Sequence, residues 1–421
     1  MNTETQAHLQ FAPSTHKPKI TKELTILPDK KIIYSVTKLF EDKERTEHRP
    51  AWNIENQYDF YDNSNSELIS QIRDTLNDWY KYYPDSEKSE LKKRLQTSFS
   101  SAFYELFLHE FFRRQGFVLE PHPILPNTTK RPDFLVCGHG LEFYLEAKES
   151  TGQSKKDSVI EKTKNQLFDQ IDKIKSPNFY FIIEELVLKG TNQPNGNKVI
   201  KYIESKLPEY DYDKLAEIFQ QSGLNNLETI EYEDYELKLL ISLNLKSPMQ
   251  RDKGGSRTIC EISPEVYYDY TDSYIKSSIE KKATRYGVLD KPYLICVNLS
   301  GEKGNSSDSI MNAVFGNFQI SSSTNSTDND VSYSRAKDGI FLNSIGPKFT
   351  RVSAILITNV RADNLDVAKH WFIQNPFARK NLPVDCFDLS KVIIENNQMQ
   401  ISNGKSIREI LGLPSYWFKY P

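Results

Sequence analysis

Hydrophobic and polar residues alternate between residues 131 and 148, a pattern that predicts two short β-strands. One face of the second strand carries Leu141, Phe143, Leu145 and Ala147, and the other carries Glu142, Tyr144, Glu146 and Lys148. Between the strands, Gly138, His139 and Gly140 favour a tight turn. We therefore expect a β-hairpin that opens with Pro132-Asp133 and ends with Glu146-Ala147-Lys148.

The pattern on either side predicts the rest of a compact core. Apolar residues recur at helical spacing over residues 86–115, and residues 117–121 form a short strand before the hairpin. A second helix is expected over residues 154–175, followed by a buried strand at 178–184 that is parallel to a neighbour. In this arrangement Leu135, Leu145, Phe181 and Ile183 lie inside one sheet.

Further elements are expected outside this core. The predicted helices are 67–82, 198–207, 213–222 and 271–286, and the predicted strands are 31–36, 236–246, 292–299 and 353–360. Residues 1–30 are polar and broken by proline, which favours an extended arm. Residues 306–334 are rich in Ser, Asn, Thr and Asp and are expected to form a mobile surface excursion.

The chain is long enough, at 421 residues, to bury a large core and to divide into more than one region. The predicted class is α/β, with a central mixed β-sheet flanked by helices and an additional C-terminal α/β region. We expect an N-terminal arm and helical lead-in over 1–85, and a core over 86–230. Residues 231–421 then extend the sheet or form a second domain.

The hairpin also carries the most distinctive chemistry of the chain. It can bring Asp133, Glu146 and Lys148 to one point, although they are separated in sequence. Two carboxylates beside an ammonium group can hold Mg²⁺ while they orient and polarise a water molecule near a phosphodiester.

This arrangement resembles the PD-(D/E)XK nuclease superfamily, which has the restriction-endonuclease-like fold. The resemblance implies Mg²⁺- or Mn²⁺-dependent hydrolysis of phosphodiester bonds, most often in DNA, with a role in restriction or phage defence. It implies that Asp133, Glu146 and the carbonyl of Ala147 hold the metal and that Lys148 acts in catalysis.

The resemblance extends to two residues on the flanking helices. Phe103-Tyr104-Glu105 matches a stretch whose carboxylate supports the metal site, and Gln166 matches a residue placed over the active site. Alternatively, Glu105 lies on the solvated side of an amphipathic helix, and Gln166 belongs to the polar flank of its helix. His109, one turn after Glu105, is either catalytic or a hydrogen-bonding residue of the helix.

The letters of the motif also occur elsewhere in the chain. Pro84-Asp85 followed by Glu90-Leu91-Lys92 matches them, but this copy has the features of a helix start. Only the copy in the hairpin combines strand alternation, a turn and apolar flanks.

Overall charge gives no attraction to nucleic acid, because the formal net charge is −3 and the pI is about 6.2. Contacts with nucleic acid must therefore come from local clusters. Arg251, Lys253 and Arg257 lie in a glycine-containing loop where they can approach phosphates, or they are simply solvated. Lys281, Lys282 and Arg285 offer a basic edge with the same two interpretations.

The remaining signals narrow the class of protein. The four cysteines are scattered singly, which favours structural thiols over a zinc site or disulfides. No apolar run of 18 residues and no N-terminal signal pattern occur, so we expect a cytoplasmic protein that does not enter a membrane. The phosphate-binding loop of nucleotide-driven motors is absent as well.

Two functions from different classes fit the sequence. The first is a metal-dependent nuclease whose expected partner is nucleic acid, with DNA favoured, and whose further partner is a second copy in a homodimer or a defence-system protein. The alternative is a non-catalytic protein that retains the nuclease fold and binds nucleic acid or another protein.

Overall fold

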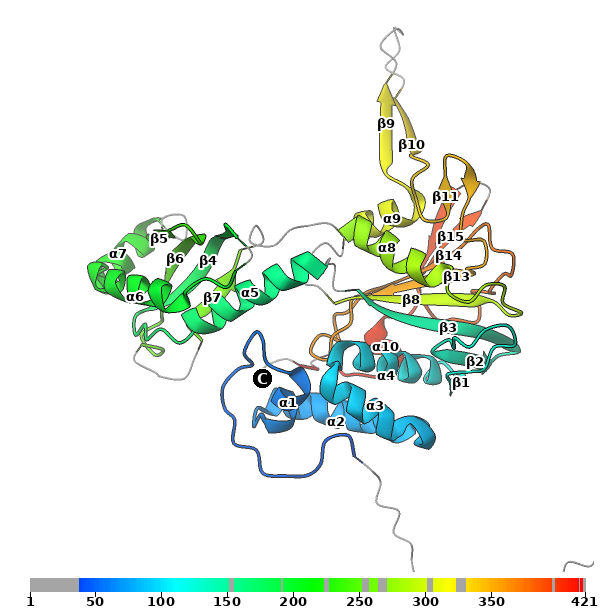
Figure 1. The fold of residues 1–421 in the computed structure, drawn as a ribbon, viewed down its shortest axis with the longest axis horizontal. Coiled ribbons are helices and arrows are strands. Elements are labelled where there is room, and N and C mark those ends of the chain that lie inside the picture. Colours follow the sequence, from blue (N-terminus) through cyan, green and yellow to red (C-terminus); the bar gives the residue numbers. More distant parts are fainter. Residues whose placement is uncertain are drawn as a thin grey trace, which may run out of the picture. The chain divides into compact units, whose positions relative to one another are not determined.

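The computed structural model describes residues 38–150, 155–190, 192–222, 227–251, 257–263, 271–300, 306–322, 331–395, 398–415 and 417–418. The predicted arm at 1–30 and the strand at 31–36 lie outside these residues. The described chain is α/β, with a large mixed sheet, a second smaller sheet and flanking helices, and this confirms the predicted class (Figure 1).

Eight strands form the large sheet, in the order β1-β2-β3-β8-β13-β14-β15-β16. Their bounds are β1 Val118–Pro121, β2 Phe134–Gly138, β3 Leu141–Ser150, β8 Tyr293–Leu299, β13 Ala354–Thr358, β14 His370–Gln374, β15 Lys391–Glu395 and β16 Gln398–Ser402. Strand β2 is antiparallel to both β1 and β3, whereas β3, β8 and β13 run parallel. Strands β8 and β13 to β16 of the C-terminal region thus extend the same sheet that contains the hairpin.

The predicted hairpin is present in the expected register. Gly138 pairs with Leu141, which leaves His139 and Gly140 as a two-residue loop. Both loop residues have positive φ, 51° and 75°, as the turn that matches the twist of a hairpin requires. The register places Phe134 opposite Leu145, so Asp133 lies just beyond the end of the paired region.

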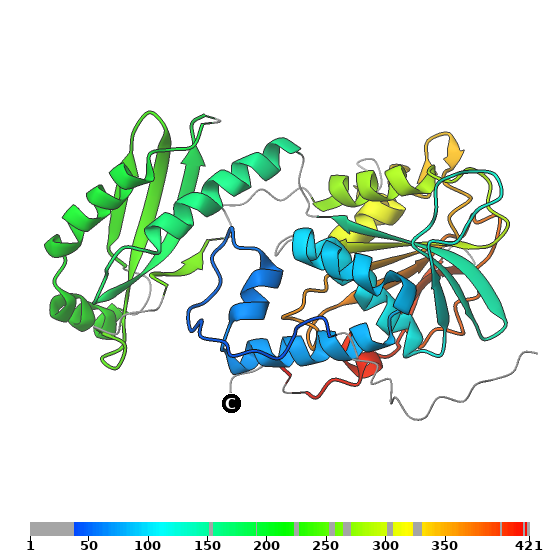
Figure 2. The same ribbon diagram turned by 60° about the horizontal axis from the view of Figure 1, so that its bottom comes forward.

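Helices cover both faces of the large sheet (Figures 1 and 2). One face packs against helices α2 Glu67–Tyr82, α4 Phe99–Arg113 and α10 Ile407–Leu411. The other face packs against α8 Thr271–Ala283 and α9 Ser307–Phe315. Alternation along β3 sends Phe143 and Leu145 to the first layer and Tyr144 to the second.

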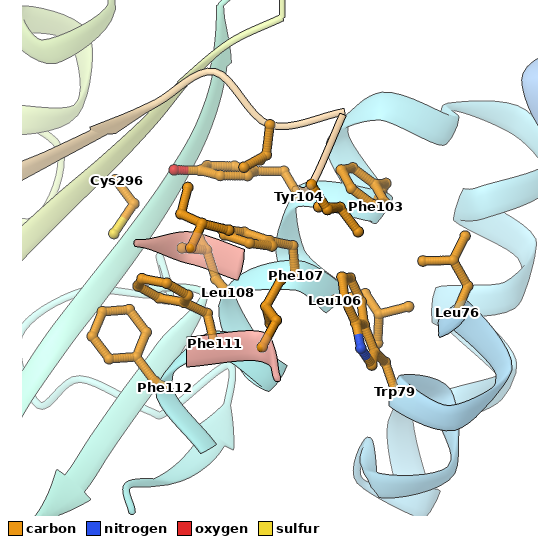
Figure 3. Close-up of a cluster of buried hydrophobic side chains, with 14 of the residues drawn as sticks. Leu76, Trp79, Phe103, Tyr104, Leu106, Phe107, Leu108, Phe111, Phe112 and Cys296 are labelled. Atoms are coloured by element: carbon orange, nitrogen blue, oxygen red, sulfur yellow. The ribbon is translucent and has the colours of Figure 1, made fainter. Parts of the chain in front are cut away.

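The first layer is dominated by aromatic side chains. Phe107 of α4 is fully buried and contacts the rings of Trp79, Tyr104 and Phe111, with centroids 5.2–6.3 Å apart (Figure 3). Tyr104 of α4 and Cys296 of β8 belong to the same buried cluster. Because α4 is buried on nearly all sides, it forms the rigid support behind the hairpin.

The single helix predicted over 86–115 is two helices in the structure, α3 Asp85–Thr97 and α4. Ser98 breaks the helix with φ −147° and ψ 60°. Helix α3 buries only Leu91 and Leu95, whereas α4 is buried almost throughout, so one straight helix could not satisfy both parts. The short helix α1 Gln57–Asn63 precedes α2.

A four-stranded sheet with its own core forms from the residues between β3 and α8. Its strands are β4 Phe179–Leu188, β5 Thr229–Glu233, β6 Leu237–Leu245 and β7 Ile259–Ile262, in the order β5-β6-β4-β7. Its helices are α5 Lys155–Ile171, α6 Gly196–Lys206 and α7 Tyr212–Ser222, with a 3-10 turn at Leu207–Glu209. Phe181 and Ile183 belong to this core, together with Leu167 and Phe168 of α5.

This second sheet corrects the expected core. The predicted strand at 178–184 is β4, but it does not join β3, and its parallel neighbour is β7. The parallel neighbour of β3 is β8, which follows α8. The expected order of helix, three strands, helix and strand is therefore completed by α8 and β8. The proposed boundary at residue 230 falls inside β5 and does not coincide with a break between the two sheets.

The excursion expected at 306–334 is partly regular structure. It contains α9 and the hairpin of β9 Phe318–Ser322 with β10 Val331–Arg335, while residues 323–330 lie outside the described part. Ile310 and Val314 of α9 are fully buried in the second layer. Burial of these apolar side chains stabilises a helix here despite the polar composition of the segment. The short strands β11 Leu342–Asn343 and β12 Gly346–Pro347 follow. All four cysteines are free.

Candidate metal-binding and catalytic site

Asp133 and Glu146 come together where β2 begins and β3 continues beyond its partner. The pairing between β2 and β3 stops at Phe134 and Leu145, so the backbone N–H of Ala147 has no partner in β2. It donates a hydrogen bond to Oδ2 of Asp133 at 2.6 Å. The C=O and N–H of a strand residue point to the same side, so the carbonyl of Ala147 points to the side of β3 on which Asp133 lies. The structure thus places together three groups that the sequence predicted as metal ligands.

The Asp133 carboxyl has an unusual affinity for protons. Burial, followed by repulsion from the nearby Glu146 carboxylate, raises the pKa of Asp133 to about 7. The Ala147 N–H and the ammonium of Lys282 act against this shift. A buried carboxyl of this kind is stabilised by a proton or by a cation, and such perturbed groups gather at functional sites.

Glu146 is almost fully buried, with 1% of its side chain exposed, and it is held by α8 and the residues after it. Lys282 forms an ion pair with Oε1, and the guanidinium of Arg285 lies 3.6 Å from the same oxygen. The hydroxyl of Tyr286 contacts Oε2, and it also lies 2.8 Å from the carbonyl of Arg131. Tyr286 has one hydroxyl proton and can donate it to one of these acceptors at a time.

Lys148 lies on the same face of β3 as Glu146, opposite Val297 of β8. Burial lowers its pKa, and the positive charges of Lys282 and Lys281 lower it further. Within the described chain, the side chain of Lys148 has no hydrogen bond or ion pair to another residue. Its half-buried ammonium group is therefore available to a ligand on this face of β3.

Glu105 is buried in α4 and is not on a solvated helix face. Arg94 of α3 forms a two-pronged ion pair with its carboxylate, and the hydroxyl of Tyr83 donates to it at 2.5 Å. The pKa of Asp133 is raised slightly by Glu105, so the two carboxylates lie within electrostatic range. Both oxygens of Glu105 are already engaged, which makes it a support for the helices beside the site.

His109 lies one turn further along α4 and is also buried. Its ring packs against Tyr83 and Phe134, with centroids 4.9 and 6.2 Å away. Its Nδ1 has no hydrogen-bond partner among the described residues. Burial lowers the pKa of His109 to about 4, so the ring is neutral at pH 7.

The neutral state of His109 leads to a pH-dependent stability. The folded pKa of about 4 lies below the ordinary value of 6.5, so the unfolded chain binds a proton that the folded chain rejects. This stabilisation is complete above pH 6.5 and is lost as the pH falls through 4, with a size on the order of 3 kcal/mol.

We expect His109→Leu to flatten the pH dependence of the unfolding free energy between pH 4 and pH 6.5. Urea unfolding at pH 4.5 and at pH 7 measures this difference in unfolding free energy. The matched control, His48→Gln at an exposed position, should leave the dependence unchanged, and the same slope in wild type and His109→Leu would contradict the assignment.

Gln166 is not brought to this cluster. It lies on α5, whose neighbouring residues Leu167 and Phe168 pack into the core of the four-stranded sheet. No contact in the described chain connects Gln166 with Asp133, Glu146 or Lys148. The physical reason is the topology, because the helix that crosses to the parallel neighbour of β3 is α8.

The basic loop has partners within the protein. Arg251 donates a hydrogen bond to Asn178 at 3.1 Å and stacks on the ring of Tyr212, and Arg257 lies 3.5 Å from Asp172. Lys253 lies outside the described residues. These arginines belong to the four-stranded sheet and its helices, and a contact with nucleic acid stays a prediction for all three residues.

Sequence reasoning missed the role of α8 at the site. Lys282, Arg285 and Tyr286 all contact Glu146, but the sequence offered only a basic edge around residues 281–285. The available signal was the second helix-then-strand pair over 271–299, which repeats the order seen over 155–188. Nothing in the local pattern says which of the two pairs lies beside the hairpin.

The residues of this cluster fit a magnesium ion in their chemistry. Asp133 and Glu146 supply hard carboxylate oxygens, and Oδ1 of Asp133 receives no hydrogen bond from a described residue. Within the described parts of the chain, no group of three or more His, Cys, Asp or Glu side chains could hold a metal ion. Mg²⁺ commonly takes only one or two carboxylates and completes its shell with water and phosphate, so two carboxylates and a carbonyl are sufficient.

Comparisons of the chain with protein-family models, curated proteins and solved structures found no match. The resemblance to the PD-(D/E)XK superfamily therefore stands on the residues of the hairpin and stays a prediction. None of the helices in the described residues has the length and apolar character needed to cross a membrane.

Proposed function

We propose that the protein is a Mg²⁺- or Mn²⁺-dependent nuclease that hydrolyses phosphodiester bonds, with DNA as its substrate. The observation that carries this proposal is the meeting of Asp133, Glu146 and the Ala147 backbone beside the unpartnered ammonium of Lys148. These groups match what the reaction needs. The carboxylates and the carbonyl would hold the metal, and the bound metal would supply charge that polarises water and phosphate.

Positive charge around the cluster also suits a phosphate substrate. Lys282 and Arg285 contact Glu146, and Lys148 lies on the same face of β3, although the chain as a whole carries a net charge of −3. Local cations of this kind attract a polyanion only over a short range in physiological salt. Binding should therefore weaken steeply as salt is added. A role in restriction or phage defence is part of the same proposal.

One observation favours the alternative function. Glu146 already has three partners from α8 and the residues after it, so the site is stable without a metal. A protein that retains the fold but only binds nucleic acid or a partner would keep such an arrangement. The two functions are separated by their behaviour toward metal, since only the nuclease requires it.

Metal binding tests the proposal without relying on a known substrate. We expect calorimetry to detect binding of Mn²⁺ to the wild type and a weakening of at least about tenfold in Asp133→Ala, because a ligating carboxylate is lost. Asp290→Ala serves as the control, since Asp290 is a surface carboxylate that bonds Tyr144 and Lys291. Equal affinity in wild type and Asp133→Ala would contradict the proposed ligand set.

The substrate is tested directly by incubation with plasmid, linear DNA and RNA. Cleavage is expected with Mg²⁺ or Mn²⁺ and not with EDTA. Binding of these nucleic acids without cleavage under every condition would favour the non-catalytic alternative.

A further inference from the structure

The ion pair between Lys282 and Glu146 is the most buried charged contact of the site. The side chain of Lys282 is 15% exposed and that of Glu146 is 1% exposed. The contact connects α8 with β3 across 136 residues of sequence. An ammonium group so placed balances the charge of Glu146 in surroundings where an unpaired carboxylate is costly.

Both oxygens of Glu146 are occupied in this arrangement. Lys282 takes Oε1, with Arg285 nearby, and Tyr286 contacts Oε2. A divalent ion bound to Glu146 would lie about 2.0–2.6 Å from one of these oxygens. It would then be held beside the Lys282 ammonium, and two cations at such short range in a poorly solvated site repel each other strongly.

We propose that Lys282 is an internal counter-ion that competes with the divalent metal for Glu146. It holds the carboxylate in place when no metal is bound, and it leaves Oε1 when the metal binds. This inference rests on the proposed function, because it takes Glu146 as a metal ligand. It assigns a new task to Lys282, which is to set the affinity of the site for metal.

Neighbouring cations do not share this task. Lys281 precedes Lys282 on α8, but its side chain is exposed. Its charge affects the site only at longer range, where it lowers the pKa of Lys148. Arg285 is 41% exposed and lies 3.6 Å from Glu146, so water already screens part of its charge. Lys281 therefore offers a matched control with the same charge, the same helix and no contact with Glu146.

The experiment is a calorimetric titration of the full-length protein with Mn²⁺ in the absence of nucleic acid. We expect Lys282→Met to bind Mn²⁺ at least about tenfold more tightly than the wild type, because the competing cation is gone. Lys281→Met should stay within about threefold of the wild type, because an exposed charge is largely screened by salt. Lys282→Arg keeps a cation at the position and should not gain affinity.

A second measurement remains informative if Lys282→Met is less stable than the wild type. In EDTA, Lys282→Met should melt at a lower temperature than the wild type, because Glu146 loses the most buried of its cationic partners. Saturating Mn²⁺ should then raise the melting temperature of Lys282→Met by more than it raises that of the wild type. This readout is available even if the variant is only marginally folded without metal.

Three outcomes would overturn the inference. Equal affinity in wild type and Lys282→Met means that Lys282 does not compete, and weaker binding in Lys282→Met means that it assists the metal. Both leave the proposed nuclease intact, provided that Asp133→Ala still loses binding. Absence of Mn²⁺ binding in the wild type and all variants would instead remove the metal, and the proposed function would fail with it.

Discussion

Lys148→Ala is expected to lower the rate of phosphodiester cleavage by about 10²- to 10³-fold, the usual effect of removing a preorganised charge from a catalytic site. Lys148 lies on the Glu146 face of β3, half-buried and with a lowered pKa. In the proposed reaction it positions the attacking water and offsets negative charge that develops on the phosphate. Metal binding should persist, because Lys148 is not one of the proposed metal ligands, and substrate binding should largely persist, because Lys282 and Arg285 remain.

The measurement is single-turnover cleavage of a defined DNA at saturating metal, with the melting temperatures of the variants compared. Lys148→Arg should not restore the rate, because a planar guanidinium differs in shape from a compact ammonium donor. Lys281→Ala is the matched control, since it removes an exposed lysine near the same site. Full activity in either variant of Lys148 would remove this residue from the mechanism.

The largest effect on stability is expected at Phe107. Phe107→Ala should lower the free energy of unfolding by about 3–5 kcal/mol, because it removes a buried ring and leaves a cavity. Phe107 is fully buried against Trp79, Tyr104 and Phe111 in the layer behind the hairpin (Figure 3). Helix α4 packs on the sheet mainly through this layer, so the cavity lowers the stability of the whole core.

Urea unfolding at constant pH and salt measures this loss. Phe318→Ala is the control, because Phe318 is 54% exposed on the β9–β10 hairpin and its removal leaves no cavity. We expect the control to change stability by less than about 1 kcal/mol. A change of that small size in Phe107→Ala would show that α4 is not a structural support of the site.

The hairpin was predictable from sequence because its determinants are local. The strict alternation at 141–148, the glycines of the turn and the position of Asp133 before β2 all act within 20 residues. The backbone geometry then fixes the contact between Asp133 and Ala147. The α/β class was predictable for the same reason, since helix and strand periods can be read within single segments.

The sheet order was not predictable because it depends on distant pairing. Strands β3 and β4 are near neighbours in sequence, yet β3 pairs with β8, about 150 residues later. The segment between them folds into a separate core that buries Phe181 and Ile183. Strands β4 and β8 are both rich in apolar residues, so periodicity could not tell which one joins the large sheet.

The partners of the site residues were hidden for a related reason. Lys282 and Tyr286 meet Glu146 only because α8 packs over β3, and Arg94 meets Glu105 only because the helix breaks at Ser98. A surface lysine and a buried one look alike in sequence. Their difference lies in tertiary contacts that no local pattern records.

The most direct measurement of the central claim is metal-dependent cleavage by wild type and Asp133→Asn under identical conditions. A supercoiled plasmid is incubated with each protein in Mg²⁺, Mn²⁺ or EDTA, and nicked and linear products are separated on a gel. The proposed site predicts that the wild type cleaves only with metal, and that Asp133→Asn has the same fold and no detectable cleavage. Cleavage by Asp133→Asn at the wild-type rate, or by the wild type in EDTA, would contradict a metal-dependent nuclease centred on Asp133 and Glu146.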